Sequence, residues 1–227
     1  MPGPDAVLWD LDGTLVDTEP YWMDAESELA VAHGVEWTHE HAMSLVGLAL
    51  LDAGGVLQRA GVAMEPAAIV DRMVRRVVER LAVEVPWRPG ARELLAALAD
   101  AGVPCALVTM SYTVIADAVV AGTPPGAFRA VVTGDAVRHG KPHPEPYLTA
   151  ARRLGVAPGR CVAIEDSQVG LASAEAAGTR ALAVPHMVPI PPGPGRSRVP
   201  TLEGVTLADL AHIGAGEVVD RLPDRVG

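Results

Sequence analysis

The chain has 227 residues, of which 49% are hydrophobic and 20% are charged, and its formal net charge is −10. This length and composition indicate a folded protein with one sizeable core, or one core with a smaller inserted domain. The negative charge and the absence of a Lys/Arg cluster argue against nucleic-acid binding, so we expect no nucleic-acid partner.

The N-terminal residues and the two cysteines bear on the compartment. Met1–Asp5 has no basic segment followed by an apolar run, which argues against a signal peptide, and no uncharged apolar run is long enough to span a bilayer. Cys105 and Cys161 lie in apolar, strand-like segments without metal-ligand spacing, which is typical of buried thiols in a reducing compartment. We therefore expect a cytoplasmic protein with no membrane partner.

The stretch after the N-terminus is the first candidate site. The apolar run Val7–Trp9 predicts a short buried strand that leads into Asp10 and Asp12. Residues at i and i+2 of a strand point to the same side, so both carboxylates are expected to face one site. Gly13 permits a sharp turn directly after them. Two carboxylates held together repel each other unless a cation lies between them or one is protonated.

The next seventy or so residues show helical periodicity without an alternating strand pattern. Helices are predicted over residues 21–33, 39–46, 50–60 and 65–82, followed by a linker at 85–90. Residues 17–85 are therefore predicted to form an α-helical domain inserted into the rest of the chain. Because the two ends of an insertion must lie close together, Val16–Glu19 and Pro86–Pro89 are candidate hinges.

From Ala91 onward, predicted helices and strands alternate. The helices cover 91–101, 112–121, 145–154 and 169–177, and the strands cover 104–109, 130–133, 161–164 and 180–184. This alternation predicts an α/β fold, with residues 1–16 and 86–227 forming a Rossmann-like, doubly wound parallel sheet covered on both faces. The proline-rich segment 185–200 is predicted to be a loop, and 202–222 to add a strand fragment and a short helix.

Polar side chains follow four of the predicted strands of this core. In open parallel sheets, ligands bind beyond the carboxyl ends of the strands. Thr109–Ser111 lies there at the start of a helix, where hydroxyls and free backbone N–H groups suit an anion. Another strand leads to Lys141, and the next ends in Glu165 and Asp166. Together with the first aspartates, these residues predict a combined metal and anion site.

Lys141 is the single lysine among the 18 basic residues. A compact ammonium on a flexible stem fits a tight anionic pocket that a planar guanidinium does not. Its neighbours His139 and His143 are expected to have supporting or solvent-exposed roles, and Asp135 is at most a supporting residue of the site. His39 and His41 lack ligand spacing and are expected on the surface of the inserted domain.

The ordered set of motifs resembles a known family. Asp10-Leu11-Asp12-Gly13-Thr14, then Thr109, Lys141-Pro142 and Glu165-Asp166-Ser167 are similar to the four motifs of the haloacid dehalogenase superfamily, in its phosphatase branch. The resemblance covers residues 7 to about 184. A helical cap directly after the first motif resembles the subgroup that contains beta-phosphoglucomutase and small phosphatases of sugar phosphates and phosphoglycolate.

The resemblance implies a role for each matching residue. Asp10 would be the nucleophile that forms an aspartyl-phosphate, and Asp12 the general acid and base. Thr109, Ser111, Lys141 and the backbone N–H of Met110 would hold the phosphoryl oxygens.

The resemblance also implies a Mg²⁺ cofactor. The ion would bind the Asp10 carboxylate, the backbone carbonyl of Asp12 and Asp166, with Glu165 close by, because hard oxygen ligands suit this ion.

Other reactions of the superfamily are separated by individual residues. A dehalogenase would lack an acid/base aspartate at position 12, a phosphonatase would need a lysine in the cap, and a pump would need membrane spans. A phosphomutase should carry a cationic residue near the loop Val46–Leu50, which is apolar here, although Arg88 or an arginine of the cap could take that role.

We therefore expect a Mg²⁺-dependent phosphatase that hydrolyses a small phosphorylated metabolite, of sugar-phosphate or phosphoglycolate type, and exists as a monomer or weak dimer. The cap is expected to open and close over the site. The alternatives are a beta-phosphoglucomutase-like phosphomutase and a non-catalytic regulatory binding module on the same fold.

Overall fold

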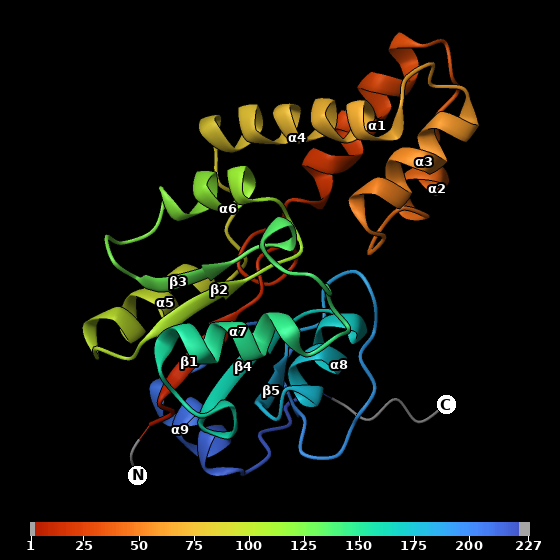
Figure 1. The fold of residues 1–227 in the computed structure, drawn as a ribbon. Helices are drawn as coiled ribbons and strands as arrows, with labels where there is room; N and C mark the ends of the chain where they lie inside the picture. Colours follow the sequence, from red (N-terminus) through yellow and green to blue (C-terminus); the bar gives the residue numbers. More distant parts are fainter. Residues whose placement is uncertain (1–2, 223–227) are drawn as a thin grey trace. The chain divides into compact units, whose positions relative to one another are not determined.

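The fold is taken from a computed structural model that describes residues 3–222 (Figure 1). Met1, Pro2 and residues 223–227, at the ends of the predicted core domain, lie outside the described residues. The chain divides into two compact units, with boundaries after Val16 and after Pro86. Pro86, assigned to the core by the sequence, falls in the helical unit, where its carbonyl accepts a 2.7 Å hydrogen bond from the Asp17 N–H.

The core unit is built on one parallel sheet. Its strands are β1 (Ala6–Trp9), β2 (Cys105–Val108), β3 (Phe128–Val132), β4 (Cys161–Glu165), β5 (Arg180–Ala183) and β6 (Ser197–Arg198). They are ordered β3-β2-β1-β4-β5-β6, and every neighbouring pair is parallel. This is the order of a doubly wound, Rossmann-like sheet, and the predicted α/β fold is confirmed.

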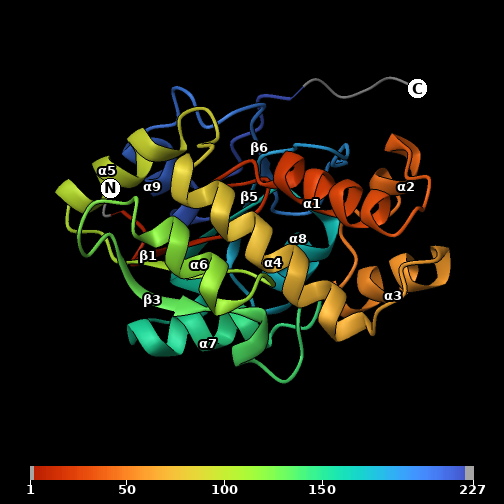
Figure 2. The ribbon, with the colours of Figure 1, turned by 90° about the horizontal axis from the view of Figure 1, so that it is seen from above.

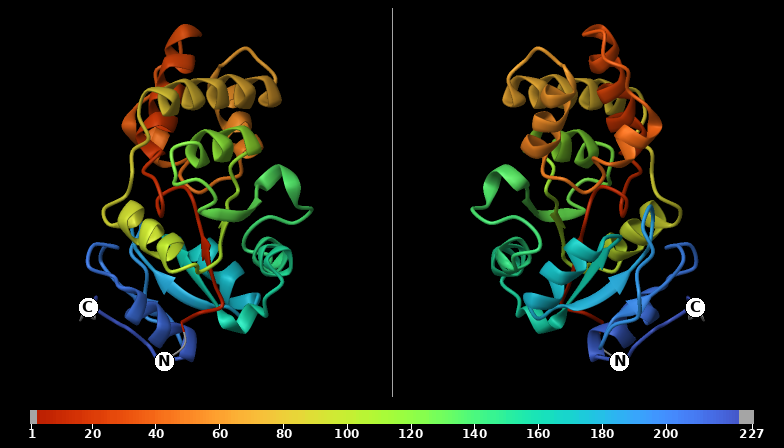
Figure 3. Two further views of the ribbon diagram at one scale, coloured as in Figure 1. Left: turned by 90° about the vertical axis from the view of Figure 1, so that its left-hand side faces the viewer. Right: turned by 90° about the vertical axis from the view of Figure 1, so that its right-hand side faces the viewer.

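Helices cover both faces of this sheet. They are α5 (Ala91–Asp100), α6 (Thr113–Val120), α7 (Glu145–Leu154), α8 (Gln168–Ala176) and α9 (Leu207–Ala215), with short 3₁₀ turns at Gly134–Ala136 and Pro158–Arg160. Figures 1 and 3 show α7 on one face of the sheet and α5 and α9 on the other. Strands covered on both faces are apolar along their whole length, which explains the unbroken apolar runs of β1 and β2.

Alternate side chains of the strands form the core under α7. Ala6 and Leu8 of β1 and Ala106 of β2 are fully buried together with Tyr147 and Ala150 of α7. Successive residues of a strand point to opposite faces, so this one cluster uses every second strand position. The small alanines allow α7 to lie close to the sheet, and they place the hydroxyl-bearing Tyr147 in the interior.

The helical unit follows β1 and precedes β2 in the chain. Its helices are α1 (Glu19–Ala32), α2 (His39–Met43), α3 (Leu50–Ala60) and α4 (Pro66–Val83). Helix α4 begins with Pro66 at its first turn, and it packs against both α1 and α3 (Figure 2). Its buried residues recur at helical spacing, and the rest of the helix presents an arginine-rich face. The buried residues are Ile69, Val70, Met73, Val74, Val77 and Leu81. The predicted helical insertion is confirmed.

Two predictions near the C-terminus are wrong. The segment predicted to be only a loop contains β6, which extends the sheet beside β5. Two residues between prolines carry no visible alternation, so tertiary pairing alone reveals this strand. The strand fragment predicted between Leu202 and Leu222 is an isolated bridge between Arg198 and Asp220, whose side chains also form a 2.8 Å ion pair. The predicted short helix there is α9.

Cys105 and Cys161 are buried and free, as the sequence predicted. Among residues 3–222, no helix is both long enough and apolar enough to cross a membrane.

Candidate active site

The predicted site residues gather at the carboxyl ends of β1, β2 and β4. Strands β1 and β4 are neighbours although residues 10–160 lie between them in the sequence, and here the strand order reverses direction. Such a switch point is where open α/β sheets bind ligands, because the loops on either side diverge and leave a crevice.

Asp10 and Asp12 lie in the turn directly after β1, at the strand end where the sequence analysis expected them. Strand β1 ends at Trp9, and the following backbone closes into a tight loop in which the Gly13 N–H donates to the Val16 carbonyl at 2.8 Å. Gly13 has a φ of +85°, a conformation that favours glycine. The turn, rather than strand alternation, brings both carboxylates to the same site.

Lys141 joins three of the strand ends. Its Nζ donates to Asp10 Oδ1 at 2.6 Å, to Glu165 Oε1 at 2.7 Å and to the Val108 carbonyl at 2.9 Å. An ammonium has three donors, so all of its hydrogen-bonding capacity is used. The side chain is only 5% exposed. This geometry fits the prediction that a tight anionic pocket needs a flexible, compact cation at position 141.

Tyr147 and Gly170, which were not predicted as site residues, help Ser167 to position Glu165. The Tyr147 hydroxyl donates to Glu165 Oε1 at 2.6 Å, and Ser167 Oγ donates to Oε2 at 3.2 Å. A Cβ added at Gly170 would lie 1.9 Å from Oε1, so only glycine leaves room for this carboxylate. Tyr147 and Gly170 lie on helices α7 and α8, where the sequence offers no sign that distinguishes them from ordinary packing residues.

Hydroxyl groups after β2 hold Asp12. Ser111 Oγ donates to Asp12 Oδ2 at 2.7 Å, and Thr109 Oγ1 donates to the same oxygen at 3.2 Å. Thr109 also accepts a bond from the Ser111 N–H at 2.9 Å. Met110 contributes its sulfur, which accepts a 3.2 Å hydrogen bond from the Lys141 N–H. Three of the four residues predicted to bind phosphate, Thr109, Met110 and Ser111, therefore position Asp12 and Lys141.

Three carboxylates could together hold a metal ion. Oxygen atoms of Asp10, Glu165 and Asp166 lie within 4.8 Å of one another. Both oxygens of Glu165 accept the hydrogen bonds described above, whereas Asp10 Oδ2 and the Asp166 carboxylate accept none from the described residues. A Cβ at Gly13 would lie 2.1 Å from Asp166 Oδ2, so this glycine keeps space open beside the cluster. An all-oxygen donor set fits a hard divalent cation.

The electrostatics of the cluster also favour a cation. Burial, and next the charge of Glu165, raise the pKa of Asp10 to about 7, and Lys141 offsets only part of this rise. Burial and the charges of Asp10 and Glu165 raise the pKa of Asp166 well above its usual range. Burial opposes the charge of Lys141, but Asp10 and Glu165 outweigh it and raise the pKa of Lys141, which stays cationic. One ammonium therefore does not neutralise two buried carboxylates and a third that is half-buried.

Two weaker candidates from the sequence lie outside this network. Asp135 accepts hydrogen bonds from the N–H and hydroxyl of Thr113 and so fixes the start of α6. His139 contacts Glu145, with 2.8 Å between Nδ1 and Oε2, and stacks on His143.

The model of the family described as haloacid dehalogenase-like hydrolases matches residues 4–178, more than half of the chain. The chain belongs to this family of hydrolases. This hydrolase is 35% identical over 196 residues to protein CbbY of Rhodobacter capsulatus, covering 79% of this chain and 85% of that protein. It is 36% identical over 181 residues to hexitol phosphatase A of Escherichia coli K12, covering 78% of this chain and 81% of the relative.

Solved structures agree with the family. CbbY from Rhodobacter sphaeroides in complex with phosphate has a TM-score of 0.80 and 30% identity, covering 91% of this chain and 99% of that one. A variant of the same protein, in complex with xylulose-1,5-bisphosphate, has a TM-score of 0.80 and 29% identity over the same shares. The hydrolase thus has the α/β core and the helical cap, α1–α4, of its family.

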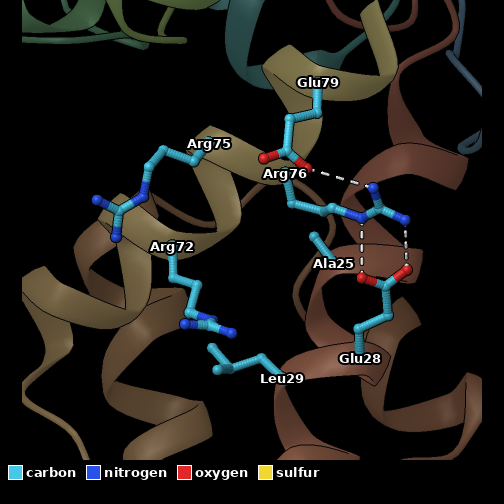
Figure 4. Close-up of a pocket in the computed structure, with 7 residues that line it drawn as sticks. All are labelled: Ala25, Glu28, Leu29, Arg72, Arg75, Arg76 and Glu79. Atoms are coloured by element: carbon cyan, nitrogen blue, oxygen red, sulfur yellow. Dashed lines mark hydrogen bonds and ion pairs between the residues drawn. The ribbon is translucent and has the colours of Figure 1, made fainter.

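The cap contains its own cationic cavity, of about 370 Å³, between α1 and α4 (Figure 4). Its lining residues are Ala25, Glu28, Leu29, Arg72, Arg75, Arg76 and Glu79. Arg76 is bound by both oxygens of Glu28, at 2.8 Å each, whereas Arg72 and Arg75 form no hydrogen bond or ion pair with the described residues. Arg72 and Arg75 are both exposed to solvent, and the cavity itself was not predicted from the sequence.

Proposed function

We propose that this hydrolase is a Mg²⁺-dependent phosphatase that acts on a small phosphorylated carbohydrate through a phosphorylated Asp10. The observation that carries the proposal is the pair of differently held aspartates. Asp10 has one oxygen bound by Lys141 and the other without a hydrogen bond from the described residues, while two hydroxyls orient Asp12. A nucleophile and a separate acid/base group are what a two-step displacement requires.

In the first step, Asp10 attacks the phosphorus of the substrate. A bond forms between an Asp10 oxygen and phosphorus while the bond from phosphorus to the leaving oxygen breaks, and Asp12 gives that oxygen a proton. Thr109, Ser111 and the Met110 N–H follow strand β2, the neighbour of β1, and would bind phosphoryl oxygens. Lys141 balances charge on Asp10 and on the incoming phosphoryl group.

In the second step, Asp12 accepts a proton from water, and the resulting hydroxide attacks the phosphorus. The bond between phosphorus and Asp10 breaks, so inorganic phosphate leaves and the Asp10 carboxylate is restored. Splitting the hydrolysis into two displacements lets the same acid/base residue serve both.

Mg²⁺, when bound, would supply positive charge to the carboxylates and to the phosphoryl oxygens. Asp10, Asp166 and the backbone carbonyl of Asp12 would hold it, with Glu165 close by. The hydrogen bonds to Glu165 from Lys141, Tyr147 and Ser167 favour a positioning role for Glu165 beside the ion.

The carbohydrate class rests on the relatives. Their names include hexitol phosphatase, and a neighbouring structure contains xylulose-1,5-bisphosphate. Phosphorylated carbohydrates are therefore the substrate class that we propose to test first on this chain.

The direct test measures inorganic phosphate released from hexitol, hexose and pentulose phosphates and from phosphoglycolate, with and without Mg²⁺. We expect release that needs Mg²⁺ and is abolished in Asp10→Asn. Asp117→Asn, an exposed aspartate on α6, is the matched control and should retain activity. A folded wild type that releases no phosphate from any of these compounds would contradict the proposal. If that protein still bound the compounds, the regulatory binding module would be the better function.

A phosphomutase is the second candidate, because such an enzyme should carry cationic cap residues and the cap cavity is lined by arginines. Arg72 and Arg75 are the two arginines of that cavity without a partner among the described residues. The test supplies a bisphosphorylated sugar as phosphoryl donor and follows sugar monophosphates by ³¹P NMR. Isomerisation faster than phosphate release, and slowed by the Arg72→Gln/Arg75→Gln double variant, would favour the mutase.

A further inference from the structure

A second group of metal-ligating side chains lies in the loop around Lys141. His139, His143 and Glu145 each present a ligand atom, and these atoms lie within 4.8 Å of one another. The two imidazole rings have centroids 4.6 Å apart and are inclined by 35°. The proposed hydrolysis uses none of the three side chains.

Glu145 is oriented and ionised. Its Oε1 accepts from the Arg138 N–H at 3.0 Å, and its Oε2 accepts from the His139 N–H at 3.2 Å. The Arg138 N–H and the His139 ring lower the pKa of Glu145 below its ordinary value. Because a carboxylate only accepts, His139 Nδ1 carries the proton in its 2.8 Å contact with Oε2. A metal cation between these two atoms would replace that proton.

His143 is the third side chain of the group. Its Nδ1 accepts a hydrogen bond from the Glu145 N–H, but this contact is 3.2 Å long and exposed to solvent. Exchanging such a bond for a metal–nitrogen bond costs little, because water can satisfy the freed N–H.

We propose that His139, His143 and Glu145 form a binding site for a transition-metal ion of the Zn²⁺ type. Two imidazole nitrogens and one carboxylate oxygen are ligands that Zn²⁺ prefers, in contrast to the all-oxygen cluster around Asp10. Ligand atoms on a tetrahedral Zn²⁺ lie about 3.3 Å apart, given Zn–N distances of about 2.0 Å. The side chain of His139 is 63% exposed, so it can rotate to close the remaining distance. Water would take the fourth position.

The site has a structural consequence for the loop. Its ligands, His139 and Glu145, lie on either side of Lys141 in the sequence. The loop is already attached to the core, since Lys141 N–H donates to Met110 Sδ and Ser173 Oγ donates to the His143 carbonyl at 2.6 Å. A bound ion would tie both ends of the segment that carries Lys141.

The test is calorimetric titration of Zn²⁺ into the full chain, in a non-chelating buffer with Mg²⁺ in large excess. We expect the wild type to bind one Zn²⁺ that the His139→Ala/His143→Ala double variant binds at least about 100-fold more weakly, because losing even the outer-shell partner of a metal ligand costs about 10- to 100-fold in affinity. Glu145→Gln should be intermediate. The matched control is His33→Ala/His39→Ala, which removes two exposed histidines of the cap and should bind like the wild type.

A second readout identifies the ligands directly. Histidine ring ¹⁵N signals of His139 and His143 should shift on addition of Zn²⁺, whereas those of His33 and His39 should not. The affinity should fall as the pH drops from 7.5 to 5.5, because binding displaces protons from the imidazoles. Equal Zn²⁺ binding by the wild type and the double variant, or no binding by the wild type, would overturn the proposal.

Discussion

Lys141 and Asp10 are 131 residues apart in the sequence, and their side chains meet at 2.6 Å between Nζ and Oδ1. The same ammonium reaches Glu165 at the end of β4 and the Val108 carbonyl at the end of β2. One side chain therefore connects the ends of three neighbouring strands and offsets part of their negative charge. Removing it affects folding stability and the proposed chemistry together.

Replacing Lys141 by methionine should leave Asp10 and Glu165 buried without their cation. We expect the free energy of unfolding to fall by about 3 kcal/mol, as for one partner removed from a buried ion pair. We expect kcat for phosphate release to fall by about 100-fold or more, because a preorganised charge beside the phosphoryl group is lost. Denaturant unfolding and steady-state kinetics measure the two effects.

Lys141→Arg tests the need for a compact ammonium at constant charge. A planar guanidinium cannot direct its donors to the same three acceptors, so this variant should also lose most of its activity. Wild-type activity in Lys141→Arg would show that charge alone is sufficient.

Gly170→Ala should disrupt Glu165. The new Cβ would lie 1.9 Å from Oε1, so the carboxylate would have to leave its bonds to Lys141 and Tyr147. We expect a loss of about 2 kcal/mol or more in stability and a large fall in activity, because a buried carboxylate would lose its partners. Gly159→Ala is the matched control, since its nearest contact would be an ordinary 3.7 Å. Equal thermal melting of the two variants would contradict this account.

Glu26 in α1 should make the protein less stable at alkaline pH. Burial raises the pKa of Glu26 to about 8, and the Trp37 indole offsets part of the rise. In the unfolded chain the carboxyl ionises near 4.5, so the free energy of unfolding falls as pH rises from about 4.5 through 8. Each pKa unit corresponds to about 1.4 kcal/mol. Glu26→Gln should therefore raise the melting temperature at pH 8 and leave it nearly unchanged at pH 4.5.

The exposed Glu36 provides the control for that measurement, because Glu36→Gln removes a carboxylate without burial. Its melting temperature should follow the wild type at both pH values. If Glu26→Gln destabilised the protein at pH 8, the carboxyl would be ionised and compensated in the folded state.

Mg²⁺ should stabilise the protein in a pH-dependent manner. The pKa of Asp10 is about 7 without a metal, against 3.8 ordinarily, so the free energy of unfolding falls as pH rises from about 4 through 7. A cation binds the ionised carboxylate and removes this penalty. The melting temperature should rise more with Mg²⁺ at pH 7.5 than at pH 5, and the increase should be lost in Asp166→Asn. An equal rise at both pH values would mean that Mg²⁺ binds elsewhere.

Much of the fold follows from local pattern. The alternation of apolar runs with amphipathic helices predicted the parallel sheet, and unbroken helical periodicity predicted the insertion. Strand and helix boundaries mostly fell within two residues, and α3 and α7 matched their predicted bounds. Glycine, proline and the spacing of apolar residues influence the backbone over only a few residues. The helices and strands that they favour can therefore be predicted from the sequence.

The candidate residues themselves were also visible in the sequence, through the paired aspartates, the single lysine and the acidic pair Glu165-Asp166. Their partners were not visible. Tyr147 and Gly170 resemble ordinary helix residues until the fold places them against Glu165. The two-residue strand β6 exists only because β5 offers it an edge.

The grouping of His139, His143 and Glu145 likewise depends on the path of the loop. Hydrogen bonds, ion pairs and steric exclusion act between side chains that the chain brings together from distant positions. Local sequence determines which residues carry the chemistry, and the tertiary structure decides which of them touch, because those short-range forces operate in space and not along the chain.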